Sequence, residues 1–168
     1  MDVISHALWG GVIAGRKNKK NFWWAFVIGF LPDALSFGIF TAMIVLGLAS
    51  GPDWQVGPPP VGSIPQYVYH LYGFTHSLFI FAVIFGLVWL IRKKPFIPLF
   101  AWLTHILIDI PTHSLDFFPT PIFWPFLNNV RFSGISWSQP IIFIPDVILL
   151  IIAYLLFFIF KRRKKARE

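Results

Sequence analysis

The sequence of 168 residues contains no cysteine. Disulfides, thiolate nucleophiles and cysteine-type zinc sites are therefore excluded, and any metal ion must be held by nitrogen and oxygen ligands. Charge is also scarce, because only 12% of the residues are Asp, Glu, Lys or Arg, against about a quarter in an ordinary soluble domain. This deficit argues strongly against a soluble globular protein. With only seven acidic residues, the chain is not a disordered acidic protein either.

Hydrophobic side chains are abundant instead, at 57% of the chain, and they are gathered into long runs. The longest runs occupy residues 22–49, 71–91, 95–110 and 140–160. Because about 20 residues suffice to cross the hydrocarbon of a membrane, we predict an all-α, polytopic membrane bundle with about four spans. Residues 3–15 are few for a full crossing, so we expect a short, partly inserted helix there, and whether it crosses stays open. The whole chain, 1–168, is expected to be one domain.

The basic residues predict the orientation in the membrane. All Lys and Arg except Arg131 lie in three short runs, at residues 16–20, 92–94 and 161–167. The positive-inside rule places these runs in the cytoplasm, with residues 161–168 as a basic tail that binds anionic lipid headgroups. Residues 50–70 and 111–139 then form outer loops. Since the positive charge is divided among runs between hydrophobic stretches, we expect membrane lipids as partners and no nucleic acid.

Ionisable side chains inside the apolar segments are the clearest functional signal. Each costs roughly 2.5–3.5 kcal/mol at the centre of a span. The apolar segments nevertheless hold six such residues: His6, Asp33, His76, His105, Asp109 and Asp146. The proline before Asp33 allows a bent helix that opens the carboxylate toward a cavity.

The spacing of these residues points to a metal ion. His105 and Asp109 are four apart, so they share one helix face at about 5–6 Å, which suits two ligands of one metal. For this pair alone, a hydrogen bond between the two side chains is an equal alternative. His76 and Asp33 would add ligands from other spans, as metal sites in bundle cores require. Three imidazoles, counting His6, and two carboxylates predict a divalent cation: zinc, as one or two ions, or manganese.

Other residues are left open at this point. His70, His113 and Asp146 flank the predicted site, and the sequence does not decide whether they join it. Neighbouring Thr75 and Ser77 are candidate donors to the metal ligands. The chain contains no H-E-x-x-H zinc-protease motif, no G-x-S-x-G elbow and no glycine-rich phosphate loop. A small-residue pattern, Gly11-x-x-x-Gly15, predicts a face where helices pack closely.

The ordered set of motifs resembles a family of bacterial membrane-bound metal-dependent hydrolases. The matching pieces are Ser5-His6-Ala7, Leu31-Pro32-Asp33, Thr75-His76-Ser77, His105-Ile106-Leu107-Ile108-Asp109, Pro111-Thr112-His113 and Phe123-Trp124-Pro125-Phe126. More distantly, the order is similar to that of zinc-dependent phospholipase C. That resemblance implies that His76, His105 and Asp109 hold one metal, that Asp109 bridges to a second metal bound by His6, and that Asp33 is a general base or a further ligand. It also implies an integral protein of the bacterial cytoplasmic (inner) membrane.

We therefore expect a membrane-embedded, metal-dependent hydrolase that cleaves a phosphoester or ester-like bond, with a metal-activated water at the outer face. A lipid or another phosphoester would be its substrate. Two alternatives from other classes remain. The same residues could form a proton or metal pathway in a small transporter, or they could only join helices in a scaffold, at around 0.6 kcal/mol for each hydrogen bond.

Overall fold

The computed structural model describes residues 1–53, 59, 62–127 and 129–165, with side chains to residue 161. Within those ranges every regular element is a helix, which confirms the predicted all-α fold. The elements are α1 (Val3–Ala14), α2 (Lys19–Asp33), the π-helical turn η1 (Ala34–Gly38), α3 (Ile39–Val45), α4 (Gln66–Thr75), α5 (Leu78–Arg92), the 3₁₀ turn η2 (Ile97–Leu99), α6 (Phe100–Thr112) and α7 (Pro140–Lys165).

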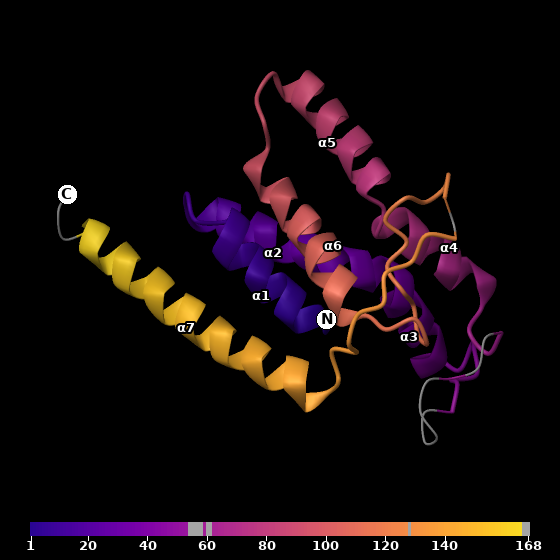
Figure 1. The fold of residues 1–168 in the computed structure, drawn as a ribbon. Coiled ribbons are helices and arrows are strands. Elements are labelled where there is room, and N and C mark those ends of the chain that lie inside the picture. Colours follow the sequence, from indigo (N-terminus) through magenta and orange to yellow (C-terminus); the bar gives the residue numbers. More distant parts are fainter. Residues whose placement is uncertain (54–58, 60–61, 128, 166–168) are drawn as a thin grey trace.

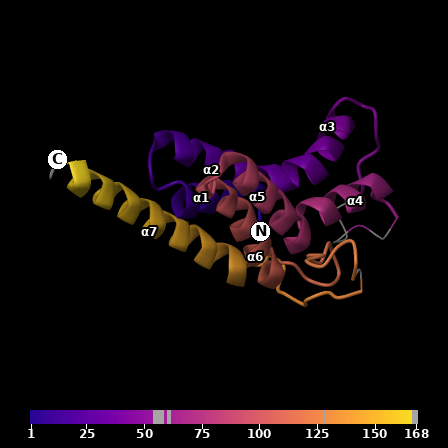
Figure 2. The same cartoon turned by 90° about the horizontal axis from the view of Figure 1, so that it is seen from above.

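Helices α1, α2 and α6 pack against one another in the middle of the molecule. In Figures 1 and 2, α7 runs along one side of this group, while α3 and α4 lie toward the opposite end. The amino terminus lies beside the end of α6. Residues near the ends of α2, α4 and α6 are thereby brought together, although they are far apart in the sequence.

Small residues allow α1 and α2 to approach closely. A Cβ atom on Gly10 would lie 2.7 Å from the carbonyl oxygen of Ala25, and one on Gly29 would lie 2.6 Å from the carbonyl oxygen of His6. A Cβ on Gly11 would lie 2.8 Å from the ring of Phe22. The predicted small-residue packing face therefore exists, and it lies against α2.

Helices of membrane-spanning length occur at two places in the described chain. Lys19–Val45 and Pro140–Lys161 are each long and apolar enough to cross a membrane, and the bent pair α4 and α5 would make a third span if it crosses as one. The first of these passes through η1 directly after Asp33, so the irregular backbone expected around Pro32 is a π-helical turn. Val3–Ala14 and Ile97–Thr112 are shorter apolar helices. The span count is thus roughly that of the prediction.

The run predicted as a span at residues 71–91 is divided by a sharp break. Helix α4 ends at Thr75, α5 begins at Leu78, and their axes are bent by 55°. The break has a local cause, because the side chain of Ser77 caps α5 by accepting from the backbone N–H of Ile80 at 3.3 Å. Its hydroxyl also donates to the carbonyl of Trp124 at 2.6 Å. His76 therefore lies in a junction between two helices rather than inside one.

The segments predicted as loops are largely irregular in their described residues, and the side of the membrane on which they lie stays a prediction. Helix α4 begins at Gln66, so residues 66–70 are helical, while residues 54–58 and 60–61 of that loop lie outside the described residues. Residues 113–139 contain turns and irregular backbone in the part that the structure describes. The basic tail continues α7 as helix to Lys165, and its last residues, 166–168, lie outside the described part.

Candidate metal centre

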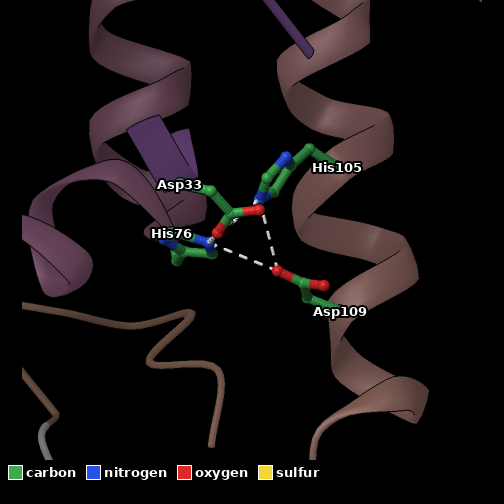
Figure 3. Close-up of side chains that lie close together, drawn as sticks. All are labelled: Asp33, His76, His105 and Asp109. Carbon is green, nitrogen blue, oxygen red and sulfur yellow. Dashed lines mark hydrogen bonds and ion pairs between the residues drawn. The ribbon is translucent and has the colours of Figure 1, made fainter. Parts of the chain in front are cut away.

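Four of the predicted site residues meet at one buried point, as Figure 3 shows. Asp33 ends α2, His76 is the C-cap of α4, and His105 and Asp109 lie on one face of α6. Each offers a ligand atom, and these atoms all lie within 4.8 Å of one another. All four side chains are buried. The structure therefore brings together these four residues from separate helices, and their role as metal ligands stays a prediction.

Hydrogen bonds on the far side of each imidazole fix which nitrogen carries the proton. Nδ1 of His105 lies 2.8 Å from the carbonyl oxygen of Gly29, and Nδ1 of His76 lies 3.1 Å from that of Tyr72. A carbonyl only accepts, so in both rings Nδ1 is the donor and Nε2 presents a lone pair in the neutral form. An N–H bonded to a backbone carbonyl is the usual support of a metal-binding histidine.

These two lone pairs point at one another. Nε2 of His76 and Nε2 of His105 are only 2.9 Å apart. Close by lie Oδ2 of Asp109 and Oδ1 of Asp33. Oδ2 of each carboxylate is buried and has no hydrogen-bond partner among the described residues. Four electron-rich atoms gathered in a buried region cost free energy unless a cation or protons lie among them. The electrostatics of the cluster therefore favour positive charge at its centre, from a cation or a proton.

The distances between ligand atoms suit a small divalent ion. Zinc lies about 2.0–2.2 Å from nitrogen and oxygen ligands, so the ligand atoms of a tetrahedral ion are roughly 3.3–3.5 Å apart. From Nε2 of His76, Oδ2 of Asp109 lies at 3.2 Å and Oδ1 of Asp33 at 3.5 Å. From Nε2 of His105 the same two oxygens lie at 3.3 Å and 3.8 Å. These four distances scatter around the expected edge of the tetrahedron, whereas the 2.9 Å between the two Nε2 atoms is shorter than such an edge.

His6 adjoins this cluster on the other side of Asp109. Its Nε2 lies 2.8 Å from Oδ1 of Asp109, its ring stacks on that of His105, and its Nδ1 is buried without a hydrogen-bond partner in the described chain. The amino group of Met1 contacts the same Oδ1. His6 thus orients the Asp109 carboxylate, but it is not one of the four residues whose ligand atoms gather. Its role as a ligand of a second metal stays a prediction.

His113 forms an outer layer of the site. Its Nε2 is 3.9 Å from Oδ1 of Asp109, and its Nδ1 is 2.8 Å from the hydroxyl of Tyr72. That hydroxyl donates to the carbonyl of Phe118 at 2.9 Å, so Nδ1 of His113 donates to it. Burial lowers the pKa of His113 to about 4, and its ring is therefore neutral near pH 7.

The other open residues lie elsewhere. His70 is exposed on α4. Asp146 is buried, but its carboxylate accepts from Ser5 at 2.7 Å and from the indole of Trp9 at 2.7 Å, which joins α7 to α1. Thr75 contacts Nδ1 of His76 at 2.9 Å, as expected of a supporting residue. Ser77, predicted to support the ligands as well, bonds to the loop instead.

Tyr72 is a residue that the sequence-based prediction missed. Its ring stacks on His76 with centroids 3.8 Å apart, its carbonyl accepts from His76, and its hydroxyl bonds to His113. The sequence could have indicated this contact through spacing, because Tyr72 is four residues before His76 and residues four apart on a helix lie on the same face.

The fold and the site together define an all-helical membrane protein with a buried cluster of histidines and aspartates. The family model of the YdjM inner membrane protein matches residues 1–168. The chain therefore belongs to the YdjM inner membrane protein family, in agreement with the predicted inner-membrane location. No curated protein and no solved structure matches the chain.

Proposed function

We propose that the protein is a metal-dependent hydrolase of the inner membrane, whose centre is formed by Asp33, His76, His105 and Asp109. The supporting observation is the pair of Nε2 lone pairs that face each other at 2.9 Å beside two carboxylates. A hydrogen-bonded scaffold would need a proton on one of these Nε2 atoms or carboxylates. Neutral imidazoles held from behind by carbonyls instead present only acceptors.

The ion we expect is zinc, with manganese as the second choice. A ligand set of two nitrogens and two oxygens in a near-tetrahedral arrangement suits zinc. When bound, such an ion lowers the pKa of a coordinated water to about 7 and stabilises negative charge on the attacked group.

Asp33 is the residue we assign to the proton of the attacking water. Its Oδ1 faces the two imidazoles, whereas its Oδ2 has no hydrogen-bond partner among the described residues. A buried, unpaired carboxylate oxygen at the edge of the site is a suitable acceptor for a proton. Asp109 is less suited to this role, because its Oδ1 is already held by His6 and the Met1 amine.

A membrane substrate is supported by the surroundings of the site. An apolar groove of about 430 Å³ lies between α1, α6 and α7, and its lining includes Met1, Trp9, Ile108 and Leu149. The amino group of Met1 contacts Asp109, so the groove reaches the wall of the site. Because α7 is of spanning length and little buried, hydrocarbon chains are the expected neighbours of this groove. We propose a phosphoester or ester-like bond of a lipid or lipid-linked compound, reached from the outer face, with the basic segments in the cytoplasm.

Metal content is the first test. Protein purified in detergent without chelator should contain about one zinc or manganese per chain, and the His105→Ala/Asp109→Ala double variant should lose it. Matched controls are His70→Ala, an exposed histidine, and Asp146→Asn, a buried aspartate outside the cluster; both should keep the metal. A metal-free wild type, or a double variant that retains the metal, would contradict the proposal.

Hydrolysis is the second test, and it separates an enzyme from a transporter. Release of nitrophenol from a bis(nitrophenyl) phosphodiester in detergent requires no gradient, whereas transport requires sealed vesicles. We expect zinc-dependent release that is lost in Asp33→Asn. Metal content without release, together with ion flux in proteoliposomes, would favour the transporter.

A further inference from the structure

A second cavity lies beside the metal centre, on the side of the loops. It has a volume of about 230 Å³, and its lining includes Tyr69, Tyr72, Trp124, Asp116 and Arg131. Gly73 also lines it, and a Cβ there would lie 2.8 Å from the ring of Trp124. The bare backbone of Gly73 thus lets the indole lie flat against α4 as one wall of the cavity.

Tyr72 is the wall shared by this cavity and the metal centre. Its ring stacks on the imidazole of His76, with centroids 3.8 Å apart, and its hydroxyl is 2.8 Å from Nδ1 of His113. A molecule in the cavity therefore lies one side chain away from a candidate metal ligand.

Arg131 is the unusual residue of this cavity. It is the one basic residue outside the three basic runs. Its guanidinium donates to the carbonyl of Val130, its own neighbour, at 3.1 Å, and it forms no ion pair within the described part of the chain. A guanidinium carries five N–H donors in a planar fork that matches phosphate and carboxylate. Most of its donors are therefore available to a ligand.

The acidic residue of the same cavity, Asp116, does not bind the guanidinium of Arg131. The carboxylate lines the same cavity and is exposed, yet the two opposite charges do not pair. No ion pair with this carboxylate therefore occupies the guanidinium, whose fork of donors suits a bidentate pair with a phosphate or carboxylate. The cavity thus contains a guanidinium group, aromatic side chains and one wall, Tyr72, that contacts the candidate metal ligand His76.

We propose that this cavity is an anion subsite in which Arg131 binds a phosphate group, and that it positions a phosphate-bearing substrate against the metal centre. The positioning role rests on the proposed hydrolase function, whereas the binding of phosphate does not. The phosphate belongs either to a lipid headgroup or to a water-soluble ester, since both present the same anion.

The test is equilibrium dialysis of inorganic phosphate against the protein in an uncharged detergent. Arg131→Gln should weaken binding about tenfold or more, because it removes a charge-assisted pair of hydrogen bonds. Arg131→Lys should restore part of the affinity, since the charge returns without the fork. Asp116→Asn should strengthen binding a few fold, because it removes a negative charge from the same cavity. The matched control is Arg16→Gln, an exposed arginine that likewise donates to a nearby carbonyl, that of Val12.

Phosphate also binds to zinc, so the comparison is repeated in the His105→Ala/Asp109→Ala background. There the phosphate that remains bound should still depend on Arg131. An affinity unchanged by Arg131→Gln in both backgrounds would overturn the inference. Loss of zinc in Arg131→Gln would overturn it too, because Arg131 would then support the metal centre rather than a separate subsite.

Competition identifies the source of the phosphate. Glycerol phosphate and dihexanoyl phosphatidylglycerol carry the anion without and with acyl chains, and the stronger competitor shows which source the cavity accepts. Displacement by neither compound would contradict the subsite. The two proposals fail separately: a metal-free wild type that binds phosphate through Arg131 removes the hydrolase, and a metal-loaded protein indifferent to Arg131 removes the subsite.

Discussion

Gly29→Ala is the substitution whose effect can be worked out most directly from the packing. The new Cβ would lie 2.6 Å from the carbonyl oxygen of His6 and 3.5 Å from the Cα of Ala7. An ordinary contact begins at 3.4 Å, so α1 and α2 must separate by about 0.8 Å. The contacts are backbone atoms, which cannot turn aside as a side chain would. Overpacking of this kind costs about 1–3 kcal/mol.

The matched control is Gly86→Ala in α5, where the added Cβ meets nothing within 4 Å. Both substitutions gain helix propensity, worth up to about 1 kcal/mol, so this gain cancels in the comparison. The free energy of unfolding of Gly29→Ala should therefore fall about 1–3 kcal/mol below that of Gly86→Ala. Reversible unfolding in mixed detergent micelles would measure both values.

The same substitution should weaken metal binding from a distance. The carbonyl of Gly29 accepts from Nδ1 of His105, and His6, on the helix that is displaced, contacts Asp109. Loss of such support around a ligand typically costs about 10–100-fold in affinity, which competition with a chelator would detect. If Gly29→Ala matched Gly86→Ala in both stability and metal affinity, the close contact between α1 and α2 would be irrelevant to the site and the reasoning would be refuted.

Four further outcomes are expected. Asp109→Asn should reduce zinc affinity by roughly 10²–10³-fold, because one of four ligands supplies about one quarter of the binding free energy. Competition with a chelator measures this change, and an affinity within threefold of wild type would show that Asp109 is not a ligand. Asp146→Asn should keep the metal while the free energy of unfolding falls by about 1–3 kcal/mol, because one donor, from Ser5 or Trp9, loses its acceptor. Ser77→Ala should cost about 1 kcal/mol through loss of the cap of α5, measured by the same unfolding experiment, and no change would argue against the cap. Acidification from about pH 8 to about pH 5 should release the metal, because imidazole binds it only in the neutral form; dialysis at each pH tests this.

The convergence of the four clustered residues was predictable because ionisable groups are costly in apolar segments. A hydrophobic run is interrupted by each of the four residues Asp33, His76, His105 and Asp109. Several such costs in free energy are offset only if these side chains interact with one another or with a common ligand. Their i, i+4 spacing correctly placed His105 and Asp109 on one face of a helix. Asp146 met the same criterion but joins α7 to α1, since a buried carboxylate satisfied by two donors looks identical in sequence.

The junction at His76 was harder to predict. A serine before an apolar run is a helix-start signal, but here apolar residues stand on both sides of it, and the run resembles one span. The break also depends on hydrogen bonds from Ser77 and Leu78 to Trp124 and Ile122, in a loop more than 40 residues away. Contacts of that range leave no periodic pattern in the sequence.

This junction has a mechanical consequence. His76 lies between two helices that meet at an angle, and a hydrogen bond from the neighbouring Ser77 ties this junction to the loop that contains Trp124. A displacement of that loop is therefore expected to move the imidazole of His76, although the loop itself does not enter the cluster. The arrangement of the four clustered side chains is in this way coupled to the position of a segment remote in the sequence.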